Sequence, residues 1–344
     1  MHQRILIIKP TALGDVAQAC LVVPQIKKFW PAAHISWVVD SAYRPILELC
    51  PQVDAIIDFP RKAWRSSWPL REILAWSRQL RERRFDVALD LQGLARSGWM
   101  TWSTRALRRI GLASAREFAS LAYTEKVADD ALHAVDRYRQ AVSQLLGQKL
   151  NSDISGIYSQ LCTPEPSQLV PWSSQNYIVF HPYSMWATKL WPWERYGQIA
   201  EALPKEKFVM VGSGPFFPVT TMNILDLRGQ TSLTELLRVL GHARAVISTD
   251  SGPAHLATAL GRPVISIFGA TDPSRTAPRC TQSIVLTAAN DVPCRPCLKR
   301  TCSHLQSIKC LEEVTLSSVL EALCQLIHEP TPASASSARG VDRA

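Results

Sequence analysis

Short aliphatic runs alternate along the chain with longer segments in which apolar residues recur every three or four positions. Such runs are typical of buried parallel strands, and the segments between them are typical of amphipathic helices. In the first half we expect strand 5–8, helix 15–29, strand 34–39, helix 42–49, strand 54–58, helix 70–84, strand 85–91, helix 93–106, a less regular region and a helix over Val135–Leu146. In the second half we expect strand Tyr177–His181, helix 193–203, strand 207–212, helix 232–241, strand 245–249, helix 253–260, strand 263–268 and helix Val314–His328. This order predicts the α/β class.

The chain length and a linker pattern predict two domains. With 344 residues the chain exceeds the usual size of one α/β core, and its hydrophobic content of 47% is ample for two. Residues 150–174 are rich in Ser, Pro and Gln and lack periodicity, as expected of a linker. We therefore expect one domain over 1–165 and another over 175–330. Residues 331–344 are small and polar, and we expect this tail to be disordered.

The junction that follows the strand Ala245–Thr249 is the most informative stretch of the chain. Asp250, Ser251, Gly252 and Pro253 lie between that strand and an apolar helical segment. A helix that begins at the carboxyl end of a parallel strand offers free backbone N–H groups and the positive end of its dipole, so it suits a phosphate. The alternative is an ordinary strand-to-helix junction with a capping residue.

A second junction of this kind lies at the N-terminus. The strand Ile5–Ile8 leads through the loop 9–15 into the helical stretch Val16–Phe29. The loop holds neither G-x-G-x-x-G nor G-x-x-x-x-G-K-[ST], which disfavours a nicotinamide dehydrogenase and a P-loop NTPase. Asp15 either caps the helix or lies at the rim of a cleft between the two domains.

Five segments, spread in order along the chain, resemble glycosyltransferase family 9, the bacterial lipopolysaccharide heptosyltransferases. They are R-I-L-I-I-K-P-T-A-L-G-D-V (Arg4–Val16), L-D-L-Q-G-L-A-R-S (Leu89–Ser97), H-A-V-D-R-Y (His133–Tyr138), T-K-L-W-P-W-E-R-Y (Thr188–Tyr196) and D-S-G-P-A-H-L-A-T-A-L-G-R-P-V (Asp250–Val264). The resemblance implies a GT-B fold, in which two Rossmann-like domains with parallel sheets face each other across a cleft. The acceptor would bind mainly to the first domain and the nucleotide-sugar to the second, and the final helix would cross back toward the first.

The resemblance also implies an activity: inverting transfer of a heptose from ADP-heptose to the Kdo/heptose inner core of lipopolysaccharide, on lipid A. Asp15 occupies the motif position of the family's catalytic aspartate and would take the proton from the acceptor hydroxyl. Lys189 would neutralise the departing diphosphate, and no cofactor is expected for catalysis. The expected donor-binding residues are Ser184, Thr188, Lys189, Asp250, Ser251, Gly252, Pro253 and His255. The expected acceptor-binding residues are Lys9, Thr11, Gly14, Arg65, Gln92 and Arg96.

Three of these assignments leave alternatives open. Asp250 either bonds sugar hydroxyls or caps its helix, and His255 is either a ligand contact or a structural histidine. The segment Gly212–Pro218 lacks the acidic residue with which many members of the family could bind the ribose. There Phe216 or Phe217 could pack on a base. The sequence therefore leaves the identity of the nucleotide open.

Positive charge is concentrated in the first half of a chain whose formal net charge is +9. Arg61–Arg84 contains eight basic residues against Glu72 and Glu82, and Arg96–Arg116 adds five more with no acid. Tryptophans are interspersed at Trp64, Trp68, Trp76, Trp99 and Trp102. This pattern suits an anionic bilayer or an anionic amphiphile, or else a solvated helix face. Nothing resembles a motif for reading nucleic acid, so we expect no such partner.

The chain shows neither a signal peptide nor an apolar run near the roughly 18 residues that a membrane helix needs. We therefore expect a cytoplasmic enzyme that associates peripherally with the inner membrane. Four of the nine cysteines, Cys294, Cys297, Cys302 and Cys310, form C-x2-C-x4-C-x7-C. This spacing predicts a structural zinc or iron site, with His304 as a substitute ligand, or else free surface thiols.

Two alternative functions remain. One is a family 9 transferase that uses another nucleotide-sugar or acceptor. The other is a non-catalytic basic protein that binds membrane or nucleic acid on a GT-B scaffold.

Overall fold

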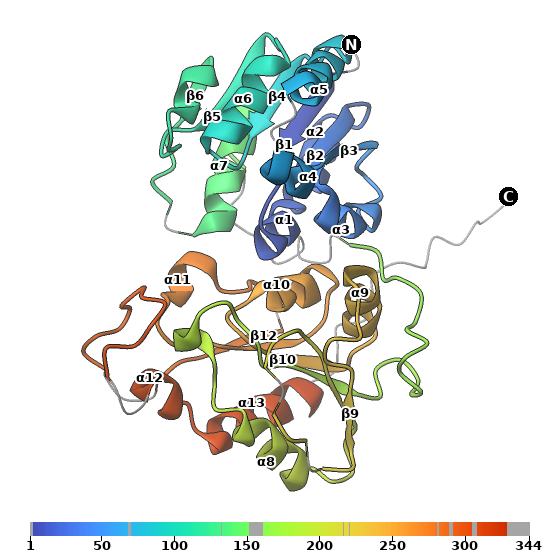
Figure 1. The fold of residues 1–344 in the computed structure, drawn as a ribbon, viewed down its shortest axis with the longest axis vertical. Helices are drawn as coiled ribbons and strands as arrows, with labels where there is room; N and C mark the ends of the chain where they lie inside the picture. Colours follow the sequence, from blue (N-terminus) through green and yellow to red (C-terminus); the bar gives the residue numbers. More distant parts are fainter. Residues whose placement is uncertain are drawn as a thin grey trace, which may run out of the picture.

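Two parallel six-stranded sheets, each flanked by helices, form the part of the chain that the structure describes (Figure 1). The structure is a computed structural model, and it describes residues 3–67, 70–131, 133–150, 161–215, 217–219, 221–280, 282–288, 292–304 and 308–328, apart from the side chains of 65–67. The expected tail at 331–344, residues 151–160 of the expected linker and Phe216 lie outside these residues.

The first sheet has the strand order β3-β2-β1-β4-β5-β6, with neighbouring strands parallel. Its strands are β1 (Arg4–Ile8), β2 (His34–Asp40), β3 (Ala55–Phe59), β4 (Val87–Asp90), β5 (Arg108–Leu112) and β6 (Glu125–Val127). Ile5–Ile8 is fully buried, since helices cover both faces of the sheet.

Successive residues of β1 enter two separate cores. Ile5 and Ile7 pack in one with α1, α2 and α7, whereas Leu6 and Ile8 pack in another with the tryptophans of α4 and α5. The helices are α1 (Leu13–Ala19), α2 (Val22–Phe29), α3 (Arg44–Glu48), α4 (Arg61–Ser67), α5 (Leu70–Glu82), α6 (Ala95–Ser103) and α7 (Ala134–Leu146), with short 3-10 turns η1 (Ser41–Tyr43) and η2 (Ala119–Ala122). The period-two alternation of a strand therefore distributes one apolar run between two layers.

The helix expected over 15–29 is two helices, α1 and α2, which are separated at Cys20 and Leu21. Pro24 explains the break. A proline has no N–H to donate to the carbonyl four residues earlier, and its ring clashes with that carbonyl. Val23 N instead bonds the Cys20 carbonyl at 3.1 Å, which is a tighter turn.

The sequence pattern missed strands β5 and β6, which lie in the region expected to be irregular. β5 begins with two arginines, and these hide its apolar pattern. Arg108 in β5 donates to Glu125 in β6 at 2.7 Å, so the polar residues pair across neighbouring strands. Helix α4 was also missed, because its sequence R-K-A-W-R-S-S has no apolar periodicity.

The second sheet has the order β12-β11-β10-β7-β8-β9, again with parallel neighbours. Its strands are β7 (Ile178–His181), β8 (Phe208–Met210), β9 (Ile224–Asp226), β10 (Ala245–Thr249), β11 (Val264–Ile267) and β12 (Ser283–Leu286). The helices are η3 (Ala187–Lys189), α8 (Glu194–Ala202), α9 (Leu233–Gly241), α10 (Gly252–Ala259), α11 (Pro273–Thr276), α12 (Lys309–Glu312) and α13 (Leu316–His328). The elements missed by the sequence pattern, β9, β12, η3, α11 and α12, span three or four residues each, too few to show a period.

The last helix, α13, stays on the second half of the molecule. We expected it to cross toward the first, but Val319, Leu323 and Leu326 pack in a core with residues of β7 and β10. The apolar face of α13 is thus buried against the sheet of its own half. Among the described residues no helix is long and apolar enough to cross a bilayer.

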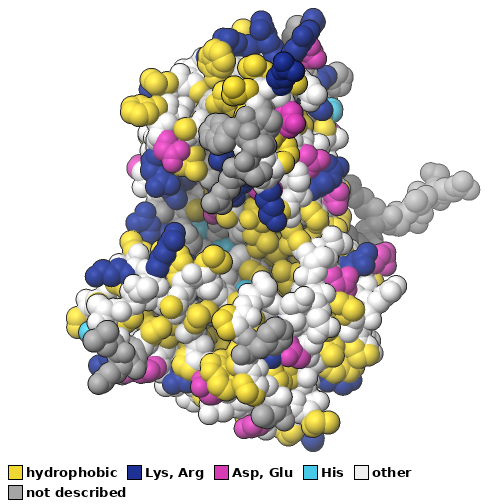
Figure 2. Space-filling model, in the orientation of Figure 1, with side chains coloured by type: hydrophobic (Ala, Val, Ile, Leu, Met, Phe, Trp, Pro, Cys, Tyr) yellow, Lys and Arg dark blue, Asp and Glu magenta, His cyan; other side chains and the backbone are white. Residues whose placement is uncertain are grey.

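The two halves meet along one continuous contact. A single buried cluster joins β1 and α1 of the first half to α9 and α10 of the second. Beside it, a short segment of the second half contacts the first half at three points: Gln18 Nε2 to the Thr276 carbonyl (3.3 Å), His133 Nε2 to the Ala277 carbonyl (3.0 Å) and Arg279 to Asp136 (2.7 Å). Figure 2 shows a hollow between the halves, with histidine side chains in view inside it.

We predict that His133, which lies in this contact, makes the protein less stable in acid. Burial, and then the neighbouring Arg279, lower the pKa of His133 to about 4. An unfolded histidine has a pKa of about 6.5, so the unfolded chain binds an extra proton between these values and the free energy of unfolding falls as the pH drops through this window. We expect His133→Gln to lose about 2 kcal/mol less than the native chain between about pH 7.5 and pH 5. Urea unfolding at both pH values measures this difference, and equal losses would contradict it.

Candidate active site

The N-termini of α1 and α10 lie directly against each other. A Cβ atom on Gly14 would lie 2.7 Å from Cδ2 of His255 and 3.2 Å from Cα of Gly252. A Cβ on Gly252 would in turn press on Leu13. These glycines are therefore required for the close approach of the two helices. The structure shows this packing role for Gly14, which we had assigned to acceptor binding.

Asp15 lies at this meeting point, in the first turn of α1. Its Oδ2 accepts a hydrogen bond from Lys9 Nζ at 3.3 Å and lies 3.4 Å from the Ala12 N–H. The Asp15 side chain is 45% exposed, whereas Lys9 is almost fully buried. Burial by itself would lower the pKa of Lys9, but Tyr138 and Asp15 outweigh it and raise that pKa. A fixed positive charge therefore lies behind an accessible carboxylate.

Lys189 and Asp250 form a matching pair on the second half. Their charged atoms are 2.7 Å apart, and only 17% of the lysine side chain and 6% of the aspartate side chain are exposed. Asp250 also accepts from the Thr271 hydroxyl at 2.6 Å. Asp250 therefore holds the ammonium in place. It does not cap α10, whose N-cap is Ser251.

The ring of His255 lies against Gly14 of α1, and charges of both pairs act on it. Burial lowers the pKa of His255, Lys189 lowers it further, and Asp250 and Asp15 oppose the shift. The ring therefore lies within electrostatic reach of the acid from the first half and of both charges from the second. His255 was one of the expected donor-side residues, and the structure places it at the boundary between the halves.

Gln18 is a residue that the sequence analysis missed. Its Nε2 lies 3.2 Å from Nδ1 of His255. An amide nitrogen only donates, so Nδ1 accepts and the ring proton lies on Nε2. No sequence signal marks this glutamine, which lies three residues after Asp15, because its partner is 237 residues away in the chain.

The expected donor-side hydroxyls differ in the hydrogen bonds that they already form within the protein. Thr188 is buried and donates to the Lys299 carbonyl at 2.6 Å, so it shapes the loop. Ser251 lies 3.1 Å from Nδ1 of His181, whose pKa burial lowers to about 4. Ser184 is half-buried, and its one described bond is a long one of 3.5 Å from the Trp186 N–H. Pro253 is buried in the first turn of α10.

The expected acceptor side is partly assembled at the neighbouring strand ends. Gln92, which follows β4, accepts from both the N–H and the hydroxyl of Thr11 at 3.3 Å. The guanidinium of Arg96 lies over the Phe59 ring at 5.5 Å, near the start of α6. Arg65 belongs to α4, but its side chain is outside the described atoms.

A carboxylate does lie near the segment where the family's acidic residue is missing. Asp226, at the end of β9, accepts from Arg228 at 2.6 Å, and Arg228 also donates to the Tyr183 hydroxyl at 3.4 Å. Arg228 stacks over Phe217 at 4.3 Å, and Trp193 stacks on the same ring at 5.0 Å. Phe217 is therefore occupied by protein groups. Sequence reasoning missed Asp226, because it lies at the end of β9 and outside the loop after β8, where the family's acidic residue is expected.

Three of the four spaced cysteines lie within electrostatic reach of the fourth, Cys310, but the four are not gathered as metal ligands among the described residues. Cys294 is exposed, Cys297 and Cys302 are half-buried, and Cys310 is buried. Burial raises the pKa of Cys310, and the other three thiols raise it further. In the part of the chain that is described, no three or more His, Cys, Asp or Glu side chains are gathered at metal-binding distance.

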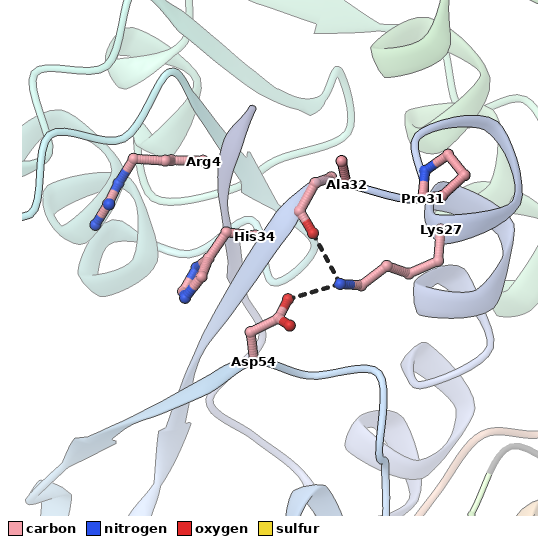
Figure 3. Close-up of a pocket in the computed structure, with 7 residues that line it drawn as sticks. Arg4, Lys27, Pro31, Ala32, His34 and Asp54 are labelled. Atoms are coloured by element: carbon pink, nitrogen blue, oxygen red, sulfur yellow. Dashed lines mark hydrogen bonds and ion pairs between the residues drawn. The ribbon is translucent and has the colours of Figure 1, made fainter. Parts of the chain in front are cut away.

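A cavity of about 420 Å³ lies at the amino ends of β1 and β2, at the other end of these strands from Asp15 (Figure 3). Arg4 and His34 line it from the amino ends of their strands, and Lys27 bonds Asp54 at 2.8 Å. Ligands of open α/β sheets bind at the carboxyl ends of the strands, and the two central charges here already neutralise each other. This cavity is therefore a poorer candidate than the contact between α1 and α10.

Comparison with known proteins identifies the family of the chain. The model of glycosyltransferase family 9 (heptosyltransferase) matches residues 73–308. Lipopolysaccharide heptosyltransferase 1 of Pseudomonas aeruginosa is 29% identical over 328 residues, covering 88% of each chain. Lipopolysaccharide core heptosyltransferase OpsX of Haemophilus influenzae is 26% identical, covering 79% of this chain and 80% of its own.

Solved structures show the same architecture. The E. coli heptosyltransferase WaaC with ADP superimposes with a TM-score of 0.78 at 24% identity, covering 94% of this chain and 100% of its own. The family 9 glycosyltransferase of Veillonella parvula gives 0.77 at 20% identity, covering 95% and 98%. The expected GT-B fold and the family resemblance are confirmed. The chain belongs to glycosyltransferase family 9 (heptosyltransferase) and is a glycosyltransferase.

Proposed function

We propose that this enzyme transfers a heptose from ADP-heptose to the Kdo/heptose inner core of lipopolysaccharide, with inversion at the anomeric carbon. The names of its relatives support the acceptor class, since they are lipopolysaccharide heptosyltransferases. The solved WaaC structures with ADP and with ADP-2-deoxy-2-fluoro heptose support the donor. The observation that carries the proposal is the contact between the start of α1, which holds Asp15, and the start of α10, beside which Lys189 pairs with Asp250.

The geometry suits a single displacement. The acceptor hydroxyl attacks the anomeric carbon while the bond from that carbon to the phosphate oxygen of ADP breaks. Asp15, accessible and braced by Lys9, takes the hydroxyl proton. Lys189, held by Asp250, and the backbone N–H groups at the start of α10 stabilise the charge on the leaving ADP. Each half thus supplies one of the two charges that the reaction needs.

We also propose that the acceptor is reached at an anionic inner-membrane leaflet, to which the enzyme binds peripherally from the cytoplasm. An acceptor that carries carboxylates and phosphates favours a basic first half, and Arg96 lies at the start of α6. The formal charge of +9 and its concentration in the first half support this placement.

Asp15→Asn should lower kcat for heptose transfer by about a hundredfold to ten-thousandfold and change KM little, because the amide still accepts a hydrogen bond but cannot take a proton. The matched control is Asp54→Asn, which removes another lysine–aspartate pair from the same half, at the amino ends of the strands. That control should transfer heptose at the native rate. Steady-state kinetics with ADP-heptose measure both variants, and near-native turnover by Asp15→Asn would exclude this residue as the base.

Gln18→Leu should raise the pKa of His255, because loss of the amide donor leaves Nδ1 open to a proton and the ring becomes charged more easily. NMR titration of the ring measures this shift against the native chain. Asp136→Asn is the comparison variant, because it weakens the same contact between the halves without touching His255. An identical pKa shift in both variants would mean that Gln18 acts only on domain contact.

We further propose that the four cysteines hold a structural zinc or iron ion. Their spacing, C-x2-C-x4-C-x7-C, supports the proposal, and the other three thiols lie within electrostatic reach of Cys310. No step of the reaction depends on the ion. Elemental analysis of the purified chain should find about one ion per chain, because such a spacing presents tetrahedral ligands. Cys294→Ser/Cys297→Ser should lose the ion, whereas the exposed Cys162→Ser should keep it. A native chain without zinc or iron would contradict the proposal.

A further inference from the structure

One outer face of the first half exposes large apolar side chains among arginines. We propose that this face docks on an anionic phospholipid bilayer. The inference rests on the proposed function, in which the acceptor is a membrane lipid. We name it the α5–α6–η2 surface and define it by six apolar side chains: Leu70 and Leu74 on α5, Trp102 on α6, Leu107 after it, and Phe118 and Leu121 at η2.

These side chains face solvent, although their types usually avoid it. Leu70 and Leu74 are each 68% exposed, Trp102 is 49% exposed and Leu107 is 87% exposed. Phe118 and Leu121 are 84% and 79% exposed. Half of the twelve exposed large hydrophobic residues of the described chain thus lie between positions 70 and 121. A concentration of this kind marks an interaction surface, whereas single exposed apolar residues need no explanation.

Packing between the three elements holds them on one layer. Trp76 of α5 stacks on Trp99 of α6 with ring centroids 5.7 Å apart. On the other side of α6, a Cβ on Gly98 would lie 2.8 Å from Cα of Ala119, so helix and η2 touch backbone to backbone. The three elements therefore form a continuous outer layer, and in Figure 2 apolar and basic side chains intermingle over this part of the molecule.

The acids on this layer all have partners within the fold. Glu72 accepts from the Trp64 indole at 3.2 Å, Glu82 pairs with Arg78, and Glu117 accepts from the Ala95 N–H at the start of α6. These contacts offset part of the negative charge of the three glutamates.

Arginines on the same layer keep their charge available. Arg71, Arg81 and Arg116 are exposed and form no ion pair within the described residues. Arg105 forms none there either, and its guanidinium lies 3.8 Å over the Trp102 ring, so cation and indole are presented together.

This combination fits a bilayer better than other occupants. Apolar side chains enter the boundary between headgroups and acyl chains while arginines bind lipid phosphates beside them. Nucleic acid would use the arginines but not six exposed apolar groups. A second protein copy would bury the leucines but would also bury unpaired guanidinium groups, which is costly. Because α6 starts at the carboxyl end of β4, the layer extends to the edge where Asp15 lies, so a lipid-borne acceptor can reach the cleft directly.

Flotation of the full chain with lipid vesicles, without donor or acceptor, tests the inference. Vesicles of phosphatidylglycerol and phosphatidylethanolamine should bind the chain in a salt-sensitive manner, and vesicles of phosphatidylcholine should bind it weakly. Leu70→Ser/Leu74→Ser should lower partition about tenfold. Arg71→Gln/Arg81→Gln/Arg105→Gln should lower it about fivefold for each arginine. Matched controls are Met185→Ser/Met222→Ser, whose residues are 95% and 101% exposed, and Lys205→Gln, all on the second half. These controls should bind as the native chain does, and circular dichroism confirms that every variant folds.

Unchanged vesicle binding in the surface variants, or equal binding of the native chain to neutral vesicles, would overturn the inference. So would an altered oligomeric state in the leucine variant, which would indicate a second protein copy as the occupant. An arginine variant that loses binding to duplex DNA but keeps binding to vesicles would also overturn it. Transfer to a water-soluble acceptor fragment separates this inference from the proposed function. The leucine variant should keep that transfer while losing transfer to a vesicle-borne acceptor. A chain that docks through this surface but transfers no heptose would refute the proposed function alone.

Discussion

The close approach of α1 and α10 is the constraint on which the rest of the structure depends. Two helices from different halves begin within van der Waals contact of each other, and this is feasible because Gly14 and Gly252 have no side chains there. The imidazole of His255 fills the space beside them. As a result, the start of α1, which carries Asp15, lies beside the start of α10, where the preceding Asp250 pairs with Lys189. The position of the candidate site is therefore a consequence of backbone packing.

Charge at the contact is balanced within each half before any substrate arrives. Lys9 is almost fully buried, and an isolated cation at such a place would cost several kcal/mol of desolvation. Asp15 offsets this cost on the first half, and Asp250 does the same for Lys189 on the second. The exposed member of each pair differs, however. The first half presents its carboxylate and the second half its ammonium, which is the arrangement that the proposed transfer requires.

Much of the fold could be predicted from the sequence, because the pattern that encodes it is local. The aliphatic run Ile5–Ile8 and its counterpart Ala245–Thr249 were read as strands from a few adjacent residues, and the structure has them as β1 and β10. Local pattern failed where an element was short or polar, as in β6, or where one residue changed the outcome. Pro24 divides a helix that is periodic throughout, because what it removes is a single N–H.

The sequence by itself determined the family, most of the longer strands and helices, and the segments that carry Asp15 and Lys189, since each is written in consecutive residues. Only the tertiary structure decided which groups those side chains meet. Lys189 forms an ion pair with Asp250, and the Thr188 hydroxyl donates to a carbonyl 111 residues away. Gln18 sets the tautomer of a histidine 237 residues away. A hydrogen bond depends on ångström-scale distance and direction, and adjacency in sequence carries no information about either once the chain has folded back on itself.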